Sequence, residues 1–434
     1  MDDRQLRQWA QDHLIRTGLL IDVVPPWEGP IFVRAQGSVI VDTAGKEYLD
    51  FNSGQMCSAL GHNNPRVVKA IQEAATTLTH ASSVYYNVPQ IQLAKRLGDL
   101  VDRPLAKSMF IQSGADSNEG AILLARRYTG RPNVAAFHLS FHGYSDVTRA
   151  MSFCATAPGY GPTMPGIFAF PTPYCYRCRY RSGGDECCTA SLTIGLEVLD
   201  RQCPAGTLAA IIVEPLVSAG GVIELPPGFL AALRRECDKR GALLILDEAQ
   251  TGLAKLGTMF GYQQEGVVPD IMTLSKHLGG GLAVSAVVTT PAIEERATAG
   301  GMIFGHSHSG DPLACAAAVA SIDEIVAENL PQRAREIGQR WQSLMGELQK
   351  RHELIGDIRG RGLLQGVELV RDRETKEPAI RETTKIFQEC VRNGLLFSVR
   401  GLHRNVLRFV PPFTTTPAQL EQGAQILEDA IRRA

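Results

Sequence analysis

Lys276 is the residue best placed for covalent chemistry, because it follows the apolar segment 271–274 and precedes the glycines of TLSKHLGGGL. Open α/β sheets bind their ligands beyond the carboxyl ends of the strands. A lysine held in such a crevice is placed to form a Schiff base with a carbonyl group. The alternative is an ordinary solvated lysine, the commonest environment for this residue type.

Asp247 ends another apolar segment, in LLILDEAQTG. A carboxylate at the end of a buried strand needs a cation or a hydrogen-bond donor. A protonated pyridine nitrogen would satisfy that need, and the carboxylate would keep the ring protonated so that it can accept electrons. A salt bridge or a metal-binding acid is the alternative for an isolated aspartate.

Ser113, Gly114 and Ala115 form a turn of small residues before a predicted helix in FIQSGADSNEGAILLARRYTG. Small residues at a helix N-terminus let backbone N–H groups approach an anion closely, and the helix dipole adds favourable charge. The segment therefore predicts a phosphate-binding site. It also matches a capping box, through Ser113 with Asp116 or Asp116 with Glu119, and the two interpretations are compatible.

The elements that must position these residues are predicted by hydrophobic patterning. Between about residues 63 and 325, short apolar runs alternate with helical periodicity, which is typical of a mainly parallel sheet covered by helices. The nearly continuous apolar character of the runs favours strands buried on both faces. The predicted strands are 134–137, 208–213, 243–246, 271–274 and 284–288.

After residue 325 the pattern predicts helices at 331–351, at 383–392 and from 417, with strands at 362–370 and 407–410. Thr416 and Gln419 form a capping box at the start of the last helix. Residues 31–51 predict a strand pair of their own. We therefore expect a large α/β domain at 63–325 and a smaller α+β domain at 326–434, which residues 1–62 join across the large one.

The composition favours a globular enzyme that binds small molecules. Of the 434 residues, 44% are hydrophobic and 21% are charged, and the formal net charge is -1. We therefore expect no nucleic-acid or membrane partner, because there is no basic field and no apolar run of membrane-spanning length. The N-terminal sequence MDDRQLRQWAQDHL lacks a secretory pattern, and most of the ten cysteines are isolated, so we expect a cytoplasmic protein with reduced thiols.

One cluster of cysteines stands apart, in YCYRCRYRSGGDECC: Cys175 and Cys178 form a CxxC, and Cys187 is adjacent to Cys188. A structural zinc site usually combines two CxxC-like hooks, which adjacent cysteines fit poorly. A zinc knuckle and a surface insertion of reduced thiols are both open interpretations.

These segments, with VEP at 213–215 and FHG at 141–143, resemble class III aminotransferases in order and spacing across essentially the whole chain. The resemblance implies fold type I with a mainly parallel seven-stranded sheet, and a homodimer or homotetramer with the active site at the subunit interface. It also implies pyridoxal 5'-phosphate (PLP) as cofactor, with amino acids and 2-oxo acids as substrates. The roles implied are Lys276 as Schiff-base lysine and proton shuttle, Asp247 at the pyridinium nitrogen, Gln250 near the ring hydroxyl, Phe141 on the ring face, and Ser307 on the phosphate of the neighbouring subunit.

Within the family, the closest resemblance is to the 2,2-dialkylglycine decarboxylases. FNSGQMCSALGH at 51–62 has Gln55 where ω-aminotransferases usually have an apolar residue; VEPLVSAGGVIELPPGF, DEAQTG, GDIRGRGLLQGVEL and LRFVPPFT also match. Three features depart from that pattern. It has tryptophan in place of Phe141 and, near the substrate carboxylate, a serine in place of Ala219, and it lacks the cysteine-bearing insertion. The resemblance also implies an alkali-metal site (K or Na) with hard oxygen ligands. Its side-chain ligands would be Ser83, Ser307 and Asp311.

Gln55 and Arg408 are the candidate ligands of substrate carboxylates. The bond that breaks in a PLP-bound amino acid is the one perpendicular to the ring plane. The Gln55 amide can hold a carboxylate there, and the planar fork of Arg408 can bind a carboxylate in the other position. A satisfied loop amide and a structural ion pair are the respective alternatives.

We therefore predict a decarboxylation-dependent aminotransferase, which releases carbon dioxide from a 2,2-dialkylglycine or a related amino acid and transfers the amino group to a 2-oxo acid such as pyruvate. A conventional class III aminotransferase acting on an ω-amine or amino acid would need no Gln55. A racemase or epimerase of the same fold would need no keto acid. A regulatory protein that binds the cofactor without catalysis is disfavoured, because Lys276, Asp247 and Arg408 are all present.

Overall fold

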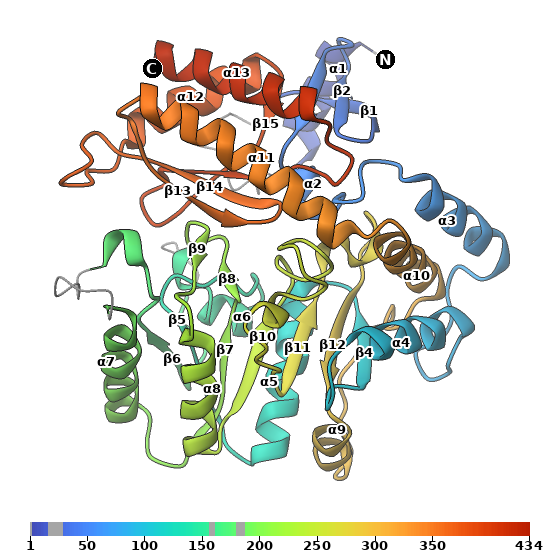
Figure 1. Ribbon diagram of the computed structural model, residues 1–434. Helices are drawn as coiled ribbons and strands as arrows, with labels where there is room; N and C mark the ends of the chain where they lie inside the picture. Colours follow the sequence, from blue (N-terminus) through green and yellow to red (C-terminus); the bar gives the residue numbers. More distant parts are fainter. Residues whose placement is uncertain (1, 16–28, 156–160, 179–186) are drawn as a thin grey trace.

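The computed structural model describes residues 2–15, 29–155, 161–178 and 187–434 (Figure 1). Its centre is a seven-stranded sheet with the order β4-β12-β11-β10-β7-β5-β6. Only β12 runs against its neighbours β11 and β4, and the other pairs are parallel. The strands are β4 (Lys107–Ile111), β5 (Asn133–Phe137), β6 (Ile167–Phe170), β7 (Leu208–Val213), β10 (Leu243–Asp247), β11 (Ile271–Leu274) and β12 (Ser285–Thr289).

All five strands predicted in this region are present, with ends that differ by at most one residue. The expected α/β fold with a mainly parallel sheet is therefore confirmed. The pattern does not predict β4, which begins with the polar residues Lys107 and Ser108, or β6, a four-residue strand at the sheet edge. Neither of them has a long apolar run.

Helices cover both faces of this sheet, which explains the continuous apolar runs. All six residues of β7 are buried. Ala210 and Ile212 belong to the core cluster that includes the buried face of α5 (Gly114–Thr129). Ile211 and Val213 face the other way, into the cluster that includes α7 (Cys187–Gln202) and α8 (Phe229–Arg240). A strand enclosed in this way needs apolar side chains at every position.

A second sheet, with the order β13-β14-β17-β16, lies beneath the helices α11, α12 and α13 at the top of Figure 1. The capping box expected at the start of α13 is present, since Thr416 and Gln419 each accept the other's backbone N–H. The bounds are β13 (Ile355–Arg361), β14 (Leu364–Leu369), β16 (Ser398–Arg400), β17 (Val406–Phe409), α11 (Leu330–Arg351), α12 (Ile380–Arg392) and α13 (Pro417–Arg433).

The N-terminal strands share a sheet with a strand from near the other end of the chain. β1 (Phe32–Gln36), β2 (Val39–Asp42) and β3 (Glu47–Asp50) are antiparallel, and β15 (Leu395–Leu396) pairs in parallel with β3. The Ser53 hydroxyl donates to the carbonyl of Val410 at 2.6 Å, which ties the same segment to the end of β17.

The remaining helices are α1 (Asp3–His13), α2 (Ser53–Met56), α3 (Pro65–Thr77), α4 (Val88–Leu100), α6 (Asp146–Ala150), α9 (Pro291–Thr298) and α10 (Pro312–Ala327). Short 3-10 helices are η1 (Phe153–Ala155), η2 (Cys175–Arg177), η3 (Gly261–Gln264) and η4 (Lys276–Gly279), and a small hairpin consists of β8 (Leu216–Val217) and β9 (Ile223–Glu224). Among the described residues, no helix combines the length and apolar character needed to cross a membrane.

Candidate functional site

The carboxyl ends of β4, β10 and β11 meet at one edge of the central sheet. Asp247, the last residue of β10, pairs with Thr273 of β11. Lys276 starts η4 two residues beyond the end of β11. Ser113 follows β4, and its carbonyl accepts a hydrogen bond from the Ser285 hydroxyl of β12 at 2.7 Å. The strand order thus brings three separate chemical segments to the same edge.

Asp247 is a buried carboxylate with several donors. Its Oδ2 lies 2.8 Å from both Asn118 Nδ2 and His142 Nδ1, and its Oδ1 accepts the Ala249 N–H at 3.0 Å. Burial acts to raise the pKa of Asp247, but the hydrogen bond and charge of His142 and the Ala249 N–H together hold that pKa below its usual value. The carboxylate therefore stays ionised in an apolar crevice and is suited to pair with a cationic ligand atom.

Lys276 is half-buried and has a φ of +53°. Burial lowers the pKa of its amine, and the Asp247 carboxylate only partly offsets that effect. A lower pKa increases the fraction of neutral amine, the form that attacks a carbonyl group. The electrostatic environment therefore favours the nucleophilic role that the sequence predicts for this lysine.

Ser113 caps α5 through the expected capping box with Asp116. The Ser113 hydroxyl accepts the Asp116 N–H at 3.2 Å, and Asp116 Oδ2 accepts the Ser113 N–H at 3.0 Å. Gly114 and Ala115 carry the next N–H groups, which have no partner inside an α-helix. The predicted phosphate site therefore centres on the backbone of these two residues.

Gly143 lets the FHG loop approach the same helix end. Its φ is +136°, and a Cβ there would lie 2.7 Å from the Cβ and 2.9 Å from the Cα of Ala115. The Ser152 hydroxyl accepts the N–H groups of His142 and Gly143 at 2.8 and 3.1 Å. The loop so held brings His142 to Asp247.

Arg408, in β17, is 1% exposed and is bonded only to neutral groups within the described part of the chain. Its Nε donates to the Ser398 hydroxyl at 3.1 Å, and its Nη1 donates to Ser218 Oγ and Gln250 Oε1, both at 3.0 Å. Nη2 is buried without a hydrogen-bond partner there, and burial lowers the pKa of the guanidinium well below its usual value. Arg408 therefore forms no ion pair with a described residue, and its Nη2 offers a donor of the kind that carboxylates bind.

Two other predicted residues lie beside Arg408. Gln250 is engaged with it through Oε1, as described above. Ala219 offers only its backbone carbonyl, which accepts the Gly401 N–H at 3.1 Å. The hydroxyl that contacts Arg408 comes instead from Ser218, the residue next to Ala219.

Glu214 is a second buried carboxylate at this edge. Its Oε1 accepts the Phe141 N–H at 3.1 Å, and its Oε2 accepts the Ser218 N–H at 3.0 Å. Burial raises the pKa of Glu214 to about 7. The Phe141 ring packs edge-to-face on Tyr144 with 4.9 Å between centroids, and its predicted stacking on a cofactor ring stays a prediction.

Gln55 is exposed in α2, which packs against η4 and so lies close to Lys276. Its amide oxygen accepts a hydrogen bond from Asn52 Nδ2 at 3.2 Å. Gln55 is thus next to the site but held by its own loop. Its contact with a substrate carboxylate stays a prediction.

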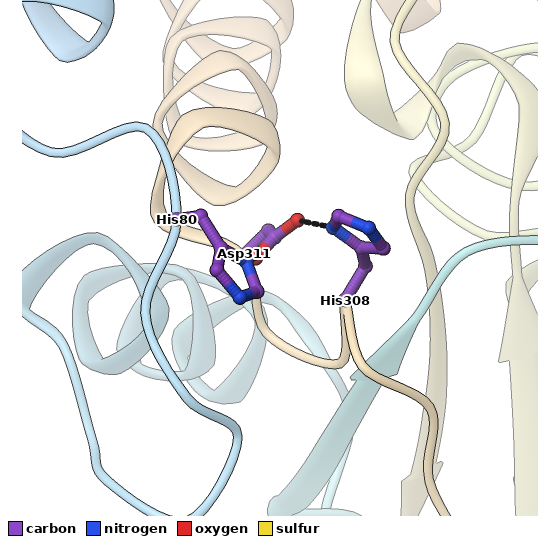
Figure 2. Close-up of side chains that lie close together, drawn as sticks. All are labelled: His80, His308 and Asp311. Atoms are coloured by element: carbon purple, nitrogen blue, oxygen red, sulfur yellow. Dashed lines mark hydrogen bonds and ion pairs between the residues drawn. The ribbon is translucent and has the colours of Figure 1, made fainter.

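Among the residues predicted to bind an alkali metal, Ser83 and Ser307 are exposed. Asp311 contacts neither of them among the described hydrogen bonds, and lies instead against His80 and His308 (Figure 2). The predicted contact of Ser307 with a phosphate concerns a second copy of the chain and stays a prediction.

The cysteine-bearing insertion lies mostly beyond the described residues. Cys175 begins η2 and Cys178 follows it, whereas residues 179–186 and the side chains of Cys187 and Cys188 are outside the description. The zinc interpretation is therefore still a prediction. The insertion is anchored by Arg177, whose Nε donates to the buried Glu368 at 2.5 Å.

Several polar residues of the site are missed by the sequence pattern. His142 and Asn118 are 105 and 129 positions from Asp247, so only the fold brings them together. Arg400 shares a face with Arg408, because Ser398 lies directly opposite Arg408 and Arg400 follows two residues later. The alternation of apolar and polar residues in FSVRG could have indicated a strand with Ser398 and Arg400 on one face. The pairing of that strand with the strand of Arg408 is not visible in the sequence.

Comparison with known proteins gives one family. The model of the class III aminotransferases matches residues 24–431. An uncharacterized aminotransferase from Schizosaccharomyces pombe is 37% identical over 405 residues, which is 92% of this chain and 90% of that protein. A leucine/methionine racemase from Thermococcus litoralis is 35% identical over 408 residues, with the same two coverages.

A solved structure has the same fold. The taurine:2-oxoglutarate aminotransferase of Bifidobacterium kashiwanohense, determined with PLP and glutamate, superposes with a TM-score of 0.91 at 28% identity and covers 100% of this chain and 98% of that one. These proteins do not support the narrower resemblance to 2,2-dialkylglycine decarboxylases. With a family model that spans nearly its whole length, the chain belongs to the class III aminotransferases of PLP fold type I, whose cofactor is PLP.

Proposed function

We propose that this enzyme transfers an amino group from an amino acid or amine to a 2-oxo acid, with Lys276 as the lysine that carries PLP. One observation supports the proposal most strongly. An ionised, buried Asp247 and a lysine of lowered pKa lie at adjacent strand ends, near an arginine without a carboxylate partner among the described residues.

The residues present fit PLP. Asp247 offers a buried carboxylate for the pyridinium nitrogen, and His142 and Asn118 hold that carboxylate in place. The first N–H groups of α5 suit the phosphate. Bound PLP supplies an electron sink for the bond that breaks at the substrate's α-carbon.

The chain's own groups would bind the substrate and move the proton. Lys276 Nζ is the base and acid, since its lowered pKa increases the fraction of neutral amine that can take a proton and return it. Arg408 binds the substrate carboxylate through Nη2, and Ser218, Ser398 and Gln250 fix the guanidinium plane. Burial excludes water and strengthens these contacts.

Arg400 favours an amino acceptor with a second carboxylate, such as 2-oxoglutarate. Its side chain is on the same face of the sheet as Arg408, and among the described residues it donates only to the carbonyl of Val399, at 3.2 Å. Two neighbouring guanidinium groups without carboxylate partners suit a dicarboxylate. The similar taurine aminotransferase uses 2-oxoglutarate, which supports this preference.

The test is a pair of half-reactions followed by absorbance. Amino donors should convert the bound cofactor to its amine form, and a 2-oxo acid should restore the first spectrum. Borohydride reduction followed by peptide mapping should find the cofactor on Lys276, and Lys276→Ala should bind some cofactor without turnover. Attachment to another lysine would refute the assignment.

Decarboxylation-dependent transamination is the second candidate, favoured by Gln55 beside η4. The Gln55 amide can donate to a carboxylate held perpendicular to the ring, so Gln55→Ala should lower carbon dioxide release from 2-aminoisobutyrate by roughly ten- to a thousand-fold. Transamination of L-alanine should lose less, because hydrogen leaves there instead of carboxylate. If the wild-type enzyme releases no carbon dioxide from any dialkylglycine, this second candidate is wrong and the conventional aminotransferase remains the proposed function.

A racemase is the third candidate, because of the similarity to the leucine/methionine racemase. It would interconvert the enantiomers of an amino acid without a 2-oxo acid. Chiral chromatography of L-leucine incubated with the holoenzyme alone separates this activity from transamination.

We also propose that two copies form a homodimer. Val84, Tyr85, Tyr86 and Ile303 are largely exposed apolar side chains on two segments that the contact between His80 and Asp311 joins. Exposed apolar residues gathered in this way are typical of an interface.

A further inference from the structure

His80, His308 and Asp311 form a compact group outside the proposed catalytic residues (Figure 2). His80 lies in the segment between α3 and α4, and the other two lie just before α10. Their ligand atoms are all within 4.8 Å of one another. It is the one cluster of at least three histidine, cysteine or acidic ligands with this spacing among the described residues.

Both imidazoles point the same nitrogen at one carboxylate. His80 Nδ1 is 2.6 Å from Asp311 Oδ1, and His308 Nδ1 is 2.5 Å from Asp311 Oδ2. The rings are 5.0 Å apart between centroids, with an angle of 57° between their planes. Two ring nitrogens and one carboxylate thus lie together, from segments 231 positions apart in the chain.

From this arrangement we propose that His80, His308 and Asp311 bind a divalent transition-metal ion of the Zn²⁺ type. Two nitrogens and one carboxylate oxygen, with a water as fourth ligand, are a common zinc set. With bonds of about 2.0 to 2.2 Å, a tetrahedral ion separates its ligand atoms by about 3.3 Å. Each Nδ1-to-carboxylate distance therefore needs to lengthen by less than about 1 Å, which side-chain rotation provides.

The donor types favour a transition metal over an alkali ion. Imidazole nitrogen suits Zn²⁺, Ni²⁺ and Cu²⁺, whereas K⁺ and Na⁺ prefer hard oxygen ligands. Each Nδ1 must be unprotonated to bind the ion. The proton that each Nδ1 shares with Asp311 therefore moves to Nε2 of the same ring or is released to solvent. The Asp311 carboxylate then neutralises half of the ion's charge.

The ion would cross-link two segments at the edge of the site. The segment of His308 also carries His306, whose Nε2 is 3.6 Å from Asp116, the residue in the capping box of α5. It carries Ser307 as well. The metal would thus hold the segment before α10 against the helix end predicted to bind phosphate.

The test is zinc titration of metal-free holoenzyme by calorimetry, with elemental analysis of the dialysed product. Wild-type protein should bind Zn²⁺ through these side chains and unfold at a higher temperature with the ion than without it. His80→Gln and His308→Gln should each weaken binding by at least about a hundredfold. His13→Gln, a matched change at an exposed histidine of α1, should leave binding unchanged.

The cysteine-bearing insertion needs its own control, because thiolates also bind zinc. Cys175→Ser/Cys178→Ser should retain the Zn²⁺ that the histidine variants lose. If the histidine variants bind zinc as tightly as wild type, or if wild type gains no thermal stability from it, the proposed site is wrong. Cofactor attachment at Lys276 is measured separately by absorbance, so failure of the metal site is distinguishable from failure of the enzymatic function.

Discussion

At the scale of single residues, Asp247→Asn tests how much the buried charge contributes. In this variant the NH2 group of the amide would face a hydrogen-bond donor in either orientation. On one side the donors are His142 and Asn118, and on the other side the donor is the Ala249 N–H. Loss of a buried, charge-assisted hydrogen bond costs on the order of 2 to 4 kcal/mol, so the chemical step should slow by roughly 30- to 1,000-fold. Single-turnover kinetics measure the change, and thermal unfolding checks the fold. A variant with near-normal turnover would exclude a pairing with the pyridinium nitrogen.

Glu214 predicts a pH dependence of stability. Burial raises its pKa from 4.5 to about 7 on folding, so the folded protein binds this proton more tightly than the unfolded chain does. The stabilisation is complete below the unfolded pKa and is lost as the pH rises through the folded one. Relative to Glu214→Gln, wild-type holoenzyme should lose on the order of 1 to 3 kcal/mol of unfolding free energy between about pH 5 and about pH 8. Urea unfolding of both proteins at several pH values measures the difference, and parallel pH profiles would contradict it.

The sequence predicts the positions of Lys276 and Asp247 because strand ends in a parallel sheet share one edge. It does not predict His142, since its burial and partners arise only when distant loops meet. Glu214 directly follows β7, so its position at a strand end was open to prediction, but its burial and its contacts with Phe141 and Ser218 were not. Arg408 is found by its motif, but its hydrogen bonds to Ser218 and Gln250 depend on the packing of the second sheet against the first. Residues near strand ends are therefore predictable, and the groups that surround them are not.

At the scale of elements, strands buried on both faces are the easiest to predict. β7 and β11 match their predicted ends, because an unbroken apolar run leaves one interpretation. β4 and β15 are not predicted, since the first is half polar and the second has two residues. α12 begins three residues before its predicted start, in a segment that lacks a capping side chain. Patterns of burial thus determine the centre of this fold better than its periphery.

Gly143→Ala tests the contact between the FHG loop and α5. The added methyl group would collide with Ala115, and the positive φ of Gly143 adds strain. We expect a loss of about 1 to 3 kcal/mol of stability and weaker PLP binding, because the N–H groups of α5 would be displaced. Equilibrium dialysis of PLP measures the affinity. Gly130→Ala at the other end of α5, where φ is also positive but nothing lies within 4 Å, is the matched control.

At the scale of the whole molecule, the exposed apolar residues predict dimerisation. Tyr86 is 86% exposed and Ile303 is 97% exposed. Tyr86→Glu and Ile303→Glu should shift the protein towards monomers, since each places a charge in an apolar contact. Analytical ultracentrifugation across a range of protein concentrations measures the shift. Trp9→Glu, at an exposed aromatic residue of α1, serves as the control, and an unchanged mass in both interface variants would place the contact elsewhere.

The pairing of β3 with β15 has a consequence for how the chain is made. Lys46 Nζ donates to the carbonyl of Arg392 at 2.5 Å across 346 positions, beside the strand pair itself. A ribosome that adds about 5 to 20 residues per second exposes β3 for tens of seconds before β15 emerges. During that time the open edge of the N-terminal sheet is a template for wrong pairing between nascent chains. Expression yield should therefore depend on chaperone supply and on translation rate downstream of β3 more than on the stability of the finished fold.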